Sequence, residues 1–162
     1  MVRMSMLRNS PVICRDRQIG LLQSISFDKA QKAVRALIVA GGLKGKCVVP
    51  AGDVLTVSRE FILVDGFAKY SRSSENPPFR FVRDTTGALV GRVKDYLIDE
   101  KALCVVSLEI MRGYMPGERH ARVWTFSYCA SNLCPDEAII AVSFSDELPE
   151  VREEACTCVF QP

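Results

Sequence analysis

Two acidic residues at matching places in the chain are the first candidates for chemistry. Asp28 and Asp99 differ by 71 in sequence number, and each follows an apolar run and begins a turn. A pair of carboxylates can act as general acid and general base only when the fold holds them at a defined separation. The sequence does not fix that separation, and aspartate at such a place commonly accepts hydrogen bonds from turn amides. We therefore interpret both residues as turn caps and predict no catalytic residues.

Cysteine and histidine are the other residue types suited to reaction. The chain has seven cysteines and one histidine, His120. Cys104 and Cys129 lie inside apolar runs, which is typical of free cysteine packed as a small buried residue. A nucleophile–base pair between either thiol and His120 is therefore disfavoured, and the sequence has no second imidazole for a histidine metal site.

The cysteine spacings also bear on metal binding. Four residues separate Cys129 from Cys134, and one residue separates Cys156 from Cys158. Common zinc sites use pairs with two intervening residues, so neither pair matches. We predict no metal and no cofactor, and we expect ordinary free thiols in a reducing compartment. A metal or redox role for the C-terminal cysteines stays open as an alternative.

The best candidate for a binding surface is the loop from Arg112 to Arg122. It joins an aromatic ring, a soft apolar side chain and several charges, and these residue types are enriched at interface centres. Loops also carry binding residues more often than the scaffold does. Against this, loop insertions are tolerated at little cost, so length alone is weak evidence of function. The predicted interaction loop comprises Arg112, Tyr114, Met115, Arg119, His120 and Arg122.

An internal repeat predicts the elements that position these residues. The segment Ile19–Val39 resembles Val90–Ile110, and a tandem duplication is the simplest interpretation. A glycine inside a strand usually marks a bulge or a close approach of another backbone. We call the difference of 71 in sequence number between matching positions the repeat offset. The pairs that share it are Gly20 with Gly91, Asp28 with Asp99, and Leu37 with Leu108.

Short apolar runs separated by turn residues predict many strands. Between Cys104 and Ile110 the apolar residues alternate with others, which predicts a half-buried strand with Ser107 and Glu109 on its exposed face. Several strands in so short a module favour closure, since closure removes exposed edges. The predicted fold is all-β, with two tandem small β-barrels. The expected strands are Pro11–Cys14, Ile19–Phe27, Val34–Ala40, Lys46–Val49, Phe61–Val64, Phe79–Val82, Leu89–Ile98, Leu103–Met111, Ala121–Phe126 and Ala138–Phe144.

A change in composition marks the boundary between the modules. A polar, serine-rich stretch ends at Pro77 and Pro78. Proline has no backbone N–H, so these two residues can neither donate a hydrogen bond to a β-ladder nor continue a helix. Domains of this size bury only about 60% of their unfolded surface, so we expect the modules to pack on each other or on a partner. The predicted divisions are a first module at 1–68, a linker at 69–78, a second module at 79–146 and an acidic, cysteine-containing tail at 147–162.

Charge is divided unevenly along the chain. Residues 1–72 hold twelve Lys/Arg against five Asp/Glu, a net charge of +7, whereas residues 73–162 hold nine against fourteen, a net charge of −5. The difference fits either mutual complementarity or two separately solvated surfaces. It leaves RNA binding by the first half open and gives no evidence for DNA. No apolar run approaches the roughly 20 residues of a membrane helix, and no signal peptide begins the chain, so we predict a cytoplasmic protein without a membrane span.

The order of several short motifs resembles the PRC-barrel family. In the first copy the motifs are Pro11-Val12, Ile19-Gly20, Asp28, Ala36-Leu37-Ile38-Val39, Val49-Pro50 and Asp53-Val54. In the second copy they are Val82-Arg83-Asp84, Gly87, Val90-Gly91, Val93, Asp99 and Leu108, and Val123-Trp124-Thr125 replaces the Val-Pro pair. The family is named for the cytoplasmic domain of the photosynthetic reaction centre H subunit and includes the second domain of the ribosome maturation factor RimM. The resemblance covers both modules and implies small all-β barrels that serve as a protein-binding or assembly platform without catalytic residues.

The resemblance and the residue patterns together predict a non-enzymatic adaptor. We expect a protein partner or self-association. A module for RNA binding or ribosome assembly is the alternative that the resemblance to RimM implies. A metal-linked or redox-linked protein that uses its C-terminal cysteines is a third class.

Overall fold

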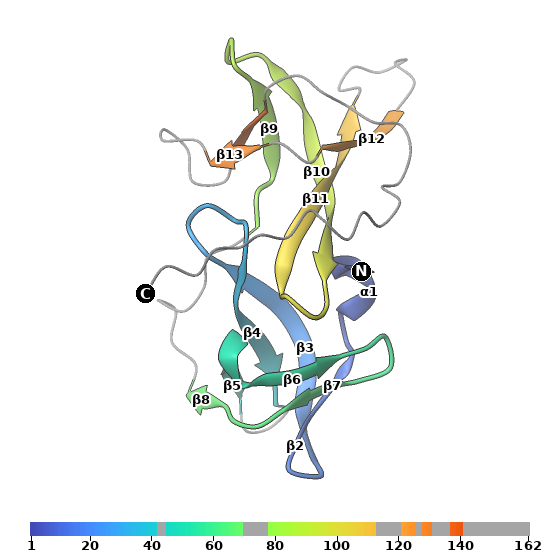
Figure 1. Cartoon of the computed structure of the whole chain (residues 1–162), viewed down its shortest axis with the longest axis vertical. Helices are drawn as coiled ribbons and strands as arrows, with labels where there is room; N and C mark the ends of the chain where they lie inside the picture. The colour runs from blue at the N-terminus through green and yellow to red at the C-terminus, as the bar shows by residue number, and fades with distance from the viewer. Residues whose placement is uncertain (42–44, 70–77, 113–120, 126–127, 131–136, 141–162) are drawn as a thin grey trace.

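The described part of the protein consists mainly of two β-sheets, each formed largely by one half of the chain (Figure 1). The structure is a computed structural model that describes residues 1–41, 45–69, 78–112, 121–125, 128–130 and 137–140. For residues 121–124, 129 and 130 only the backbone is described. Strands dominate the described chain, so the predicted all-β class is confirmed.

The first sheet has seven strands from the first half of the chain. Its centre is the long strand β3, whose last three residues are buried and whose end, Phe27, stacks on Tyr96 of the second sheet. In spatial order the strands are β6 (Val54–Val57), β7 (Ile62–Val64), β2 (Pro11–Cys14), β3 (Arg17–Phe27), β4 (Val34–Ala40), β5 (Lys46–Pro50) and β8 (Ala68–Lys69). A 3-10 turn, Ala51–Asp53, links β5 to β6.

The second sheet also has seven strands, six of them from the second half. In spatial order these six are β13 (Cys129–Ala130), β14 (Glu137–Ile140), β9 (Phe81–Asp84), β10 (Leu89–Asp99), β11 (Cys104–Arg112) and β12 (Ala121–Thr125). The seventh is β1 (Val2–Arg3), which pairs with β10 and is followed by the short helix α1 (Met4–Leu7).

The two sheets share one strand order. The series β6-β7-β2-β3-β4-β5 matches β13-β14-β9-β10-β11-β12 strand for strand, and the pairs β2/β7 and β9/β14 are both parallel. Bulges also recur at matching places, between Leu22 and Ser24 in β3 and between Val93 and Asp95 in β10. Within the described residues no ladder joins the first and last strand of either sheet. Closure into barrels therefore stays a prediction.

The N-terminal segment crosses from one half of the molecule to the other. Val2 pairs with Ile98 and Arg3 with Leu97, so residues of the predicted first module extend the second sheet. Figure 1 shows the N-terminus and α1 beside the lower end of β10. One hydrophobic cluster also includes core residues of both sheets, among them Leu37 and Leu108. The halves therefore pack on each other.

Strand β11 corrects one prediction from residue alternation. Ser107 and Glu109 were expected on an exposed face, but only 0% and 2% of their surfaces are exposed. Alternation assigns polar residues to water, and this rule fails where another segment covers the second face. Arg3, from the segment that crosses over, lies against Glu109. The prediction of a half-buried strand was therefore wrong.

One hairpin turn of the second sheet follows the chemistry of its residues. The Asp84 carboxylate accepts hydrogen bonds from the hydroxyl and amide of Thr86 and from the Ala88 amide, and Gly87 has a φ of 87°. These bonds, led by the Thr86 hydroxyl, hold the pKa of Asp84 below its usual value. Asp84 and Gly87 therefore hold this turn through local hydrogen bonds and a positive φ.

Within the ranges described, no helix is long and apolar enough to cross a bilayer.

Gly20 and Gly91 lie at points where two backbones meet. A Cβ at Gly20 would collide with the carbonyl oxygen of Ala40, and a Cβ at Gly91 with that of Met111. Ala40 and Met111 are themselves related by the repeat offset, so both sheets bring β3 to β4 and β10 to β11 in the same way.

We predict that Gly20→Ala or Gly91→Ala destabilises the protein by about 1–3 kcal/mol, because the backbone must move to admit the methyl group. Urea unfolding measures the change. Gly52→Ala is the matched control, since an added Cβ there meets no atom within 4 Å. Equal stability of the Gly20 and Gly52 variants would contradict the close approach.

Candidate functional site

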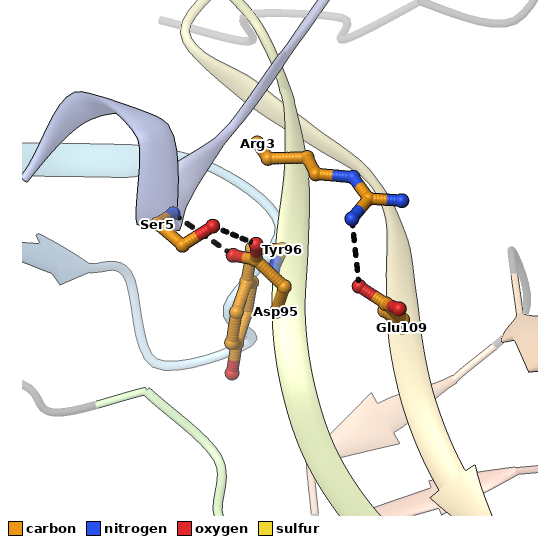
Figure 2. Close-up of polar contacts among 5 residues, drawn as sticks. All are labelled: Arg3, Ser5, Asp95, Tyr96 and Glu109. Carbon is orange, nitrogen blue, oxygen red and sulfur yellow. Dashed lines mark hydrogen bonds and ion pairs between the residues drawn. The ribbon is translucent and has the colours of Figure 1, made fainter. Parts of the chain in front are cut away.

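The N-terminal segment binds two carboxylates of the second sheet (Figure 2). The amide of Ser5 donates to Asp95 Oδ1 at 3.0 Å, and its hydroxyl donates to Asp95 Oδ2. The Arg3 guanidinium lies 3.6 Å from Glu109 Oε2. Asp95 and Glu109 face each other across the β10/β11 ladder. Residues 3–5 therefore hold this end of the chain against the second sheet.

Burial makes these polar contacts necessary. Only 4% of Asp95 and 2% of Glu109 is exposed, and a buried charge is costly unless it is paired or hydrogen-bonded. Two like charges on facing strands also repel each other. Arg3 supplies an opposite charge, and the Ser5 and Tyr96 amides both donate to Asp95. Both carboxylates therefore have a partner in the N-terminal segment.

A second polar cluster, which we call the Gln31 cluster, lies where the two sheets meet. It consists of Gln31, Phe79, Tyr96 and Tyr128. Gln31 Oε1 accepts hydrogen bonds from the Tyr96 hydroxyl at 2.6 Å and from the Phe79 amide at 2.9 Å. The Gln31 carbonyl oxygen accepts one from the Tyr128 hydroxyl at 2.6 Å. Gln31 is 1% exposed and belongs to the first half, whereas these three donors belong to the second.

Aromatic rings enclose this cluster. Phe27, at the end of β3, stacks on Tyr96 with ring centroids 4.8 Å apart, and Phe79 meets Tyr128 edge-on at 6.0 Å. The ammonium group of Lys32 lies 3.4 Å from the Tyr128 ring centroid. Stacked and edge-on pairs of this kind contribute about 0.5–1.5 kcal/mol each beyond burial. The cluster therefore combines apolar packing with directed hydrogen bonds.

The backbones of the two halves join beside the Gln31 cluster in a reciprocal way. Val34 N–H donates to the Leu103 carbonyl at 2.8 Å, and Val105 N–H donates to the Lys32 carbonyl at 2.7 Å. The repeat offset relates Val34 to Val105, and it also relates Lys32 to Leu103. These two backbone bonds are therefore reciprocal, as in the interface of a two-fold symmetric dimer.

A cavity of about 290 Å³ opens between the sheets near this contact. Its volume is at the lower limit for small-molecule pockets. The N-terminal segment and Phe79 complete its wall. Eight lining residues form four pairs related by the repeat offset: Leu22 and Val93, Gln23 and Lys94, Ser24 and Asp95, and Ile25 and Tyr96.

Asp28 and Asp99, which the sequence predicts to be turn caps, each hold a turn. Asp28 Oδ1 accepts hydrogen bonds from the amides of Lys32 and Ala33, at 2.7 and 3.2 Å. Asp99 Oδ1 accepts from Lys101 and Ala102, at 2.8 and 3.0 Å. The bond from Ala102, followed by that from Lys101, holds the pKa of Asp99 below its usual value. Each carboxylate bonds its own turn, as the turn-cap interpretation expects.

Most of the predicted interaction loop lies outside the described residues. This applies to Tyr114, Met115, Arg119 and His120. Arg112 is exposed at the end of β11, and Arg122 pairs with Met111 through the β11/β12 ladder. The proposed role of this loop therefore stays a prediction.

Of the described cysteines, Cys104 is not the free thiol that the sequence predicts. Cys14 and Cys47 are free, and burial raises the pKa of the Cys47 thiol, which disfavours the reactive thiolate. Cys104 is disulfide-bonded, to a cysteine whose side chain is outside the description. Sequence spacing does not reveal which thiols meet in space, so the prediction for Cys104 was wrong. Among the described residues, no group of three or more His, Cys, Asp or Glu is placed to hold a metal.

The important polar residues of the junction were missed by the sequence reasoning. Glu109 is a charged residue between apolar neighbours, Leu108 and Ile110, whereas Asp95 follows Lys94 and is less conspicuous. The position of Glu109 is a usable signal, because a charge inside such a run must find a partner. Gln31 sits in a turn among polar residues and gives no such signal.

Comparison with known proteins does not identify a family. No protein-family model matches the chain, and no curated protein matches its sequence. The resemblance to PRC-barrel proteins therefore rests on the motifs in the sequence.

We predict that Tyr96→Phe lowers the free energy of unfolding by about 1–2 kcal/mol, because Gln31 loses a buried hydrogen-bond donor. A double-mutant cycle with Gln31→Leu should give a coupling energy of at least about 0.5 kcal/mol, as expected for residues in contact. Ser58→Ala is the uncoupled control, since the Ser58 hydroxyl bonds within its own turn. Additive effects of the Tyr96 and Gln31 substitutions would contradict the cluster.

Alkaline pH should weaken the junction. Burial, the main cause, raises the pKa of Tyr96 and of Tyr128 above the ordinary value of 10.0. The unfolded chain therefore releases these protons first, so their contribution to stability is present below about pH 10 and is lost as the pH rises further. Unfolding curves across this range should fall more steeply for the native protein than for a Tyr96→Phe, Tyr128→Phe variant. Parallel curves would rule out this linkage.

Proposed function

We propose that this protein is a non-enzymatic adaptor that binds a protein partner or a second copy of itself. The contacts that the buried polar side chains make support this proposal. Asp95, Glu109 and Gln31, the buried polar side chains best suited to chemistry, form the contacts that join the N-terminal segment and the two sheets. The fold uses them to fix its own shape, which suits a scaffold with binding surfaces.

The fold supports an origin by duplication and a PRC-barrel-like architecture. The strand order is the same in both sheets, and the matched bulges and the matched glycine contacts follow the repeat offset. We infer that two copies of one small β unit were joined head to tail and pack through a reciprocal interface. Small units of this kind expose much of their surface and gain stability by packing together.

One observation carries the adaptor proposal: an apolar edge on the first sheet. Within the described residues β6 pairs only with β7, so its outer edge can accept a further strand. Leu55 on this strand is 60% exposed, and Phe61 in the adjoining turn is 36% exposed. The β6–β7 hairpin projects at the side of the molecule (Figure 1). Exposed apolar residues on a strand with one open edge favour contact with another polypeptide.

Site-specific photocrosslinking in cells tests this surface. With the crosslinking residue at position 55 or 61, we expect the same protein, or a second copy of this chain, to be captured at both positions. Lys101, exposed on a turn of the second sheet, is the control position and should capture neither. Leu55→Glu should abolish capture through position 61 without altering the unfolding curve. Equal capture at position 101, or capture that survives Leu55→Glu, would refute the proposal.

A further inference from the structure

A groove at one end of the first sheet concentrates positive charge. It measures about 1010 Å³ and lies where the β2–β3 turn, the start of β5 and the segment between β7 and β8 meet. We call it the basic groove. Its charged lining consists of four cations, Arg15, Arg17, Lys46 and Lys69, and one carboxylate, Asp65, which gives a net charge of +3.

The backbone holds two of these cations in a tight turn. Arg15 and Asp16 have φ values of 48° and 65°, and Cys14 pairs with Arg17 across them. Positive φ at both central residues is the geometry of the type I′ hairpin turn, which matches the twist of the strands. Glycine and asparagine adopt positive φ most easily. The geometry of the turn therefore does not explain the arginine at position 15. Arg15 and Arg17 are both exposed.

The opposite wall of the groove combines a cation with an aromatic ring. Strand β8 pairs with β5 so that Lys69 lies opposite Cys47, and the Lys69 side chain is exposed. Phe67, two residues earlier, also lines the groove and is 53% exposed. A phenylalanine exposed to this extent contributes little to the core and leaves a ring face open to a ligand.

The second sheet shows that the fold itself does not require these charges. The turn that corresponds to Arg15 and Asp16 is Asp84–Ala88, which contains no lysine or arginine. It is stabilised by the Asp84 carboxylate instead. Two sheets of the same strand order therefore connect corresponding strands by turns of different length and charge, and the cation beside the second turn, Arg83, donates to the Gly87 carbonyl within it. The cations of the basic groove are a property of its surface.

We propose that the basic groove binds a single strand of nucleic acid, with phosphates at Arg15, Arg17 and Lys69 and a base stacked on Phe67. A basic groove that follows the backbone, together with an aromatic ring for a base, is the usual way to bind single strands without sequence preference. An acidic peptide would use the cations but would offer Phe67 a ring only where it carries an aromatic residue, whereas every nucleotide carries a base. This inference goes beyond the adaptor role and involves a different surface.

Salt dependence and a base-stacking variant test this proposal separately. The probe is a fluorescein-labelled oligouridylate of about 12 nucleotides, which fits the usual site size of such grooves. Binding to the full chain is followed by anisotropy as the salt concentration is varied. With three to four phosphates bound, log K should fall against log salt with a slope of about −2 to −3. An oligothymidylate of the same length distinguishes RNA from DNA.

The variants should separate the two kinds of interaction. Arg17→Gln or Lys69→Gln should weaken binding and make the salt slope shallower by about 0.7 for each phosphate that is no longer neutralised. Phe67→Ala should weaken binding about five-fold to a hundred-fold at every salt concentration and leave the slope unchanged, because stacking involves no counterions. Arg59→Gln and Leu89→Ala are the matched controls, since both residues are exposed and neither lines the groove.

Three results would overturn the proposal. The first is no binding of either oligonucleotide at low salt. The second is an equal loss of affinity in Arg17→Gln and Arg59→Gln, which would indicate attraction by overall charge. The third is binding of a synthetic peptide of residues 146–154, an acidic run of this chain, with no binding of nucleic acid.

Discussion

The burial of hydrogen-bonding groups between the two sheets is the constraint on which the rest of the structure depends. An amide or hydroxyl taken out of water costs free energy unless it finds a partner in the protein. At the junction the side-chain and main-chain oxygens of Gln31 accept hydrogen bonds across the boundary, from Tyr96, Phe79 and Tyr128. Sliding or rotating one sheet against the other would break these bonds together. The relative position of the sheets is therefore fixed by directed hydrogen bonds as well as by apolar packing.

The junction between the two halves is partly reciprocal. Val34 and Val105 make the same backbone bond in opposite directions, and the wall of the cavity contains matched pairs from both halves. The symmetry is broken where the N-terminal segment crosses to the second sheet. There Ser24 and Ile25 of the first half correspond to Asp95 and Tyr96 of the second, which bind Ser5 and Gln31. The departures from symmetry therefore supply the polar contacts that lock the halves.

Local features of the fold were within reach of the sequence, whereas long-range ones were not. Asp84 and Gly87 determine their turn by bonds between near neighbours, and the repeat located the glycines at the strand contacts. Glu109 was misplaced because alternation cannot reveal that a segment from the N-terminus covers the strand. Gln31 was missed because its partners across the junction are far away in sequence. For the candidate surfaces, the charge imbalance of the first half was visible in the sequence, but its gathering into one groove depends on how three separate segments meet.

Native-state hydrogen exchange of the Val34 and Val105 amides tests the central claim most directly. These amides donate across the junction, so their exchange reports when the two sheets separate. If the buried junction makes the sheets one cooperative unit, both amides should exchange with the same free energy as the central strand amides of β3 and β10. Exchange of Val34 and Val105 at much lower free energy than the strand amides would show that the sheets part while each stays folded, and would contradict the account.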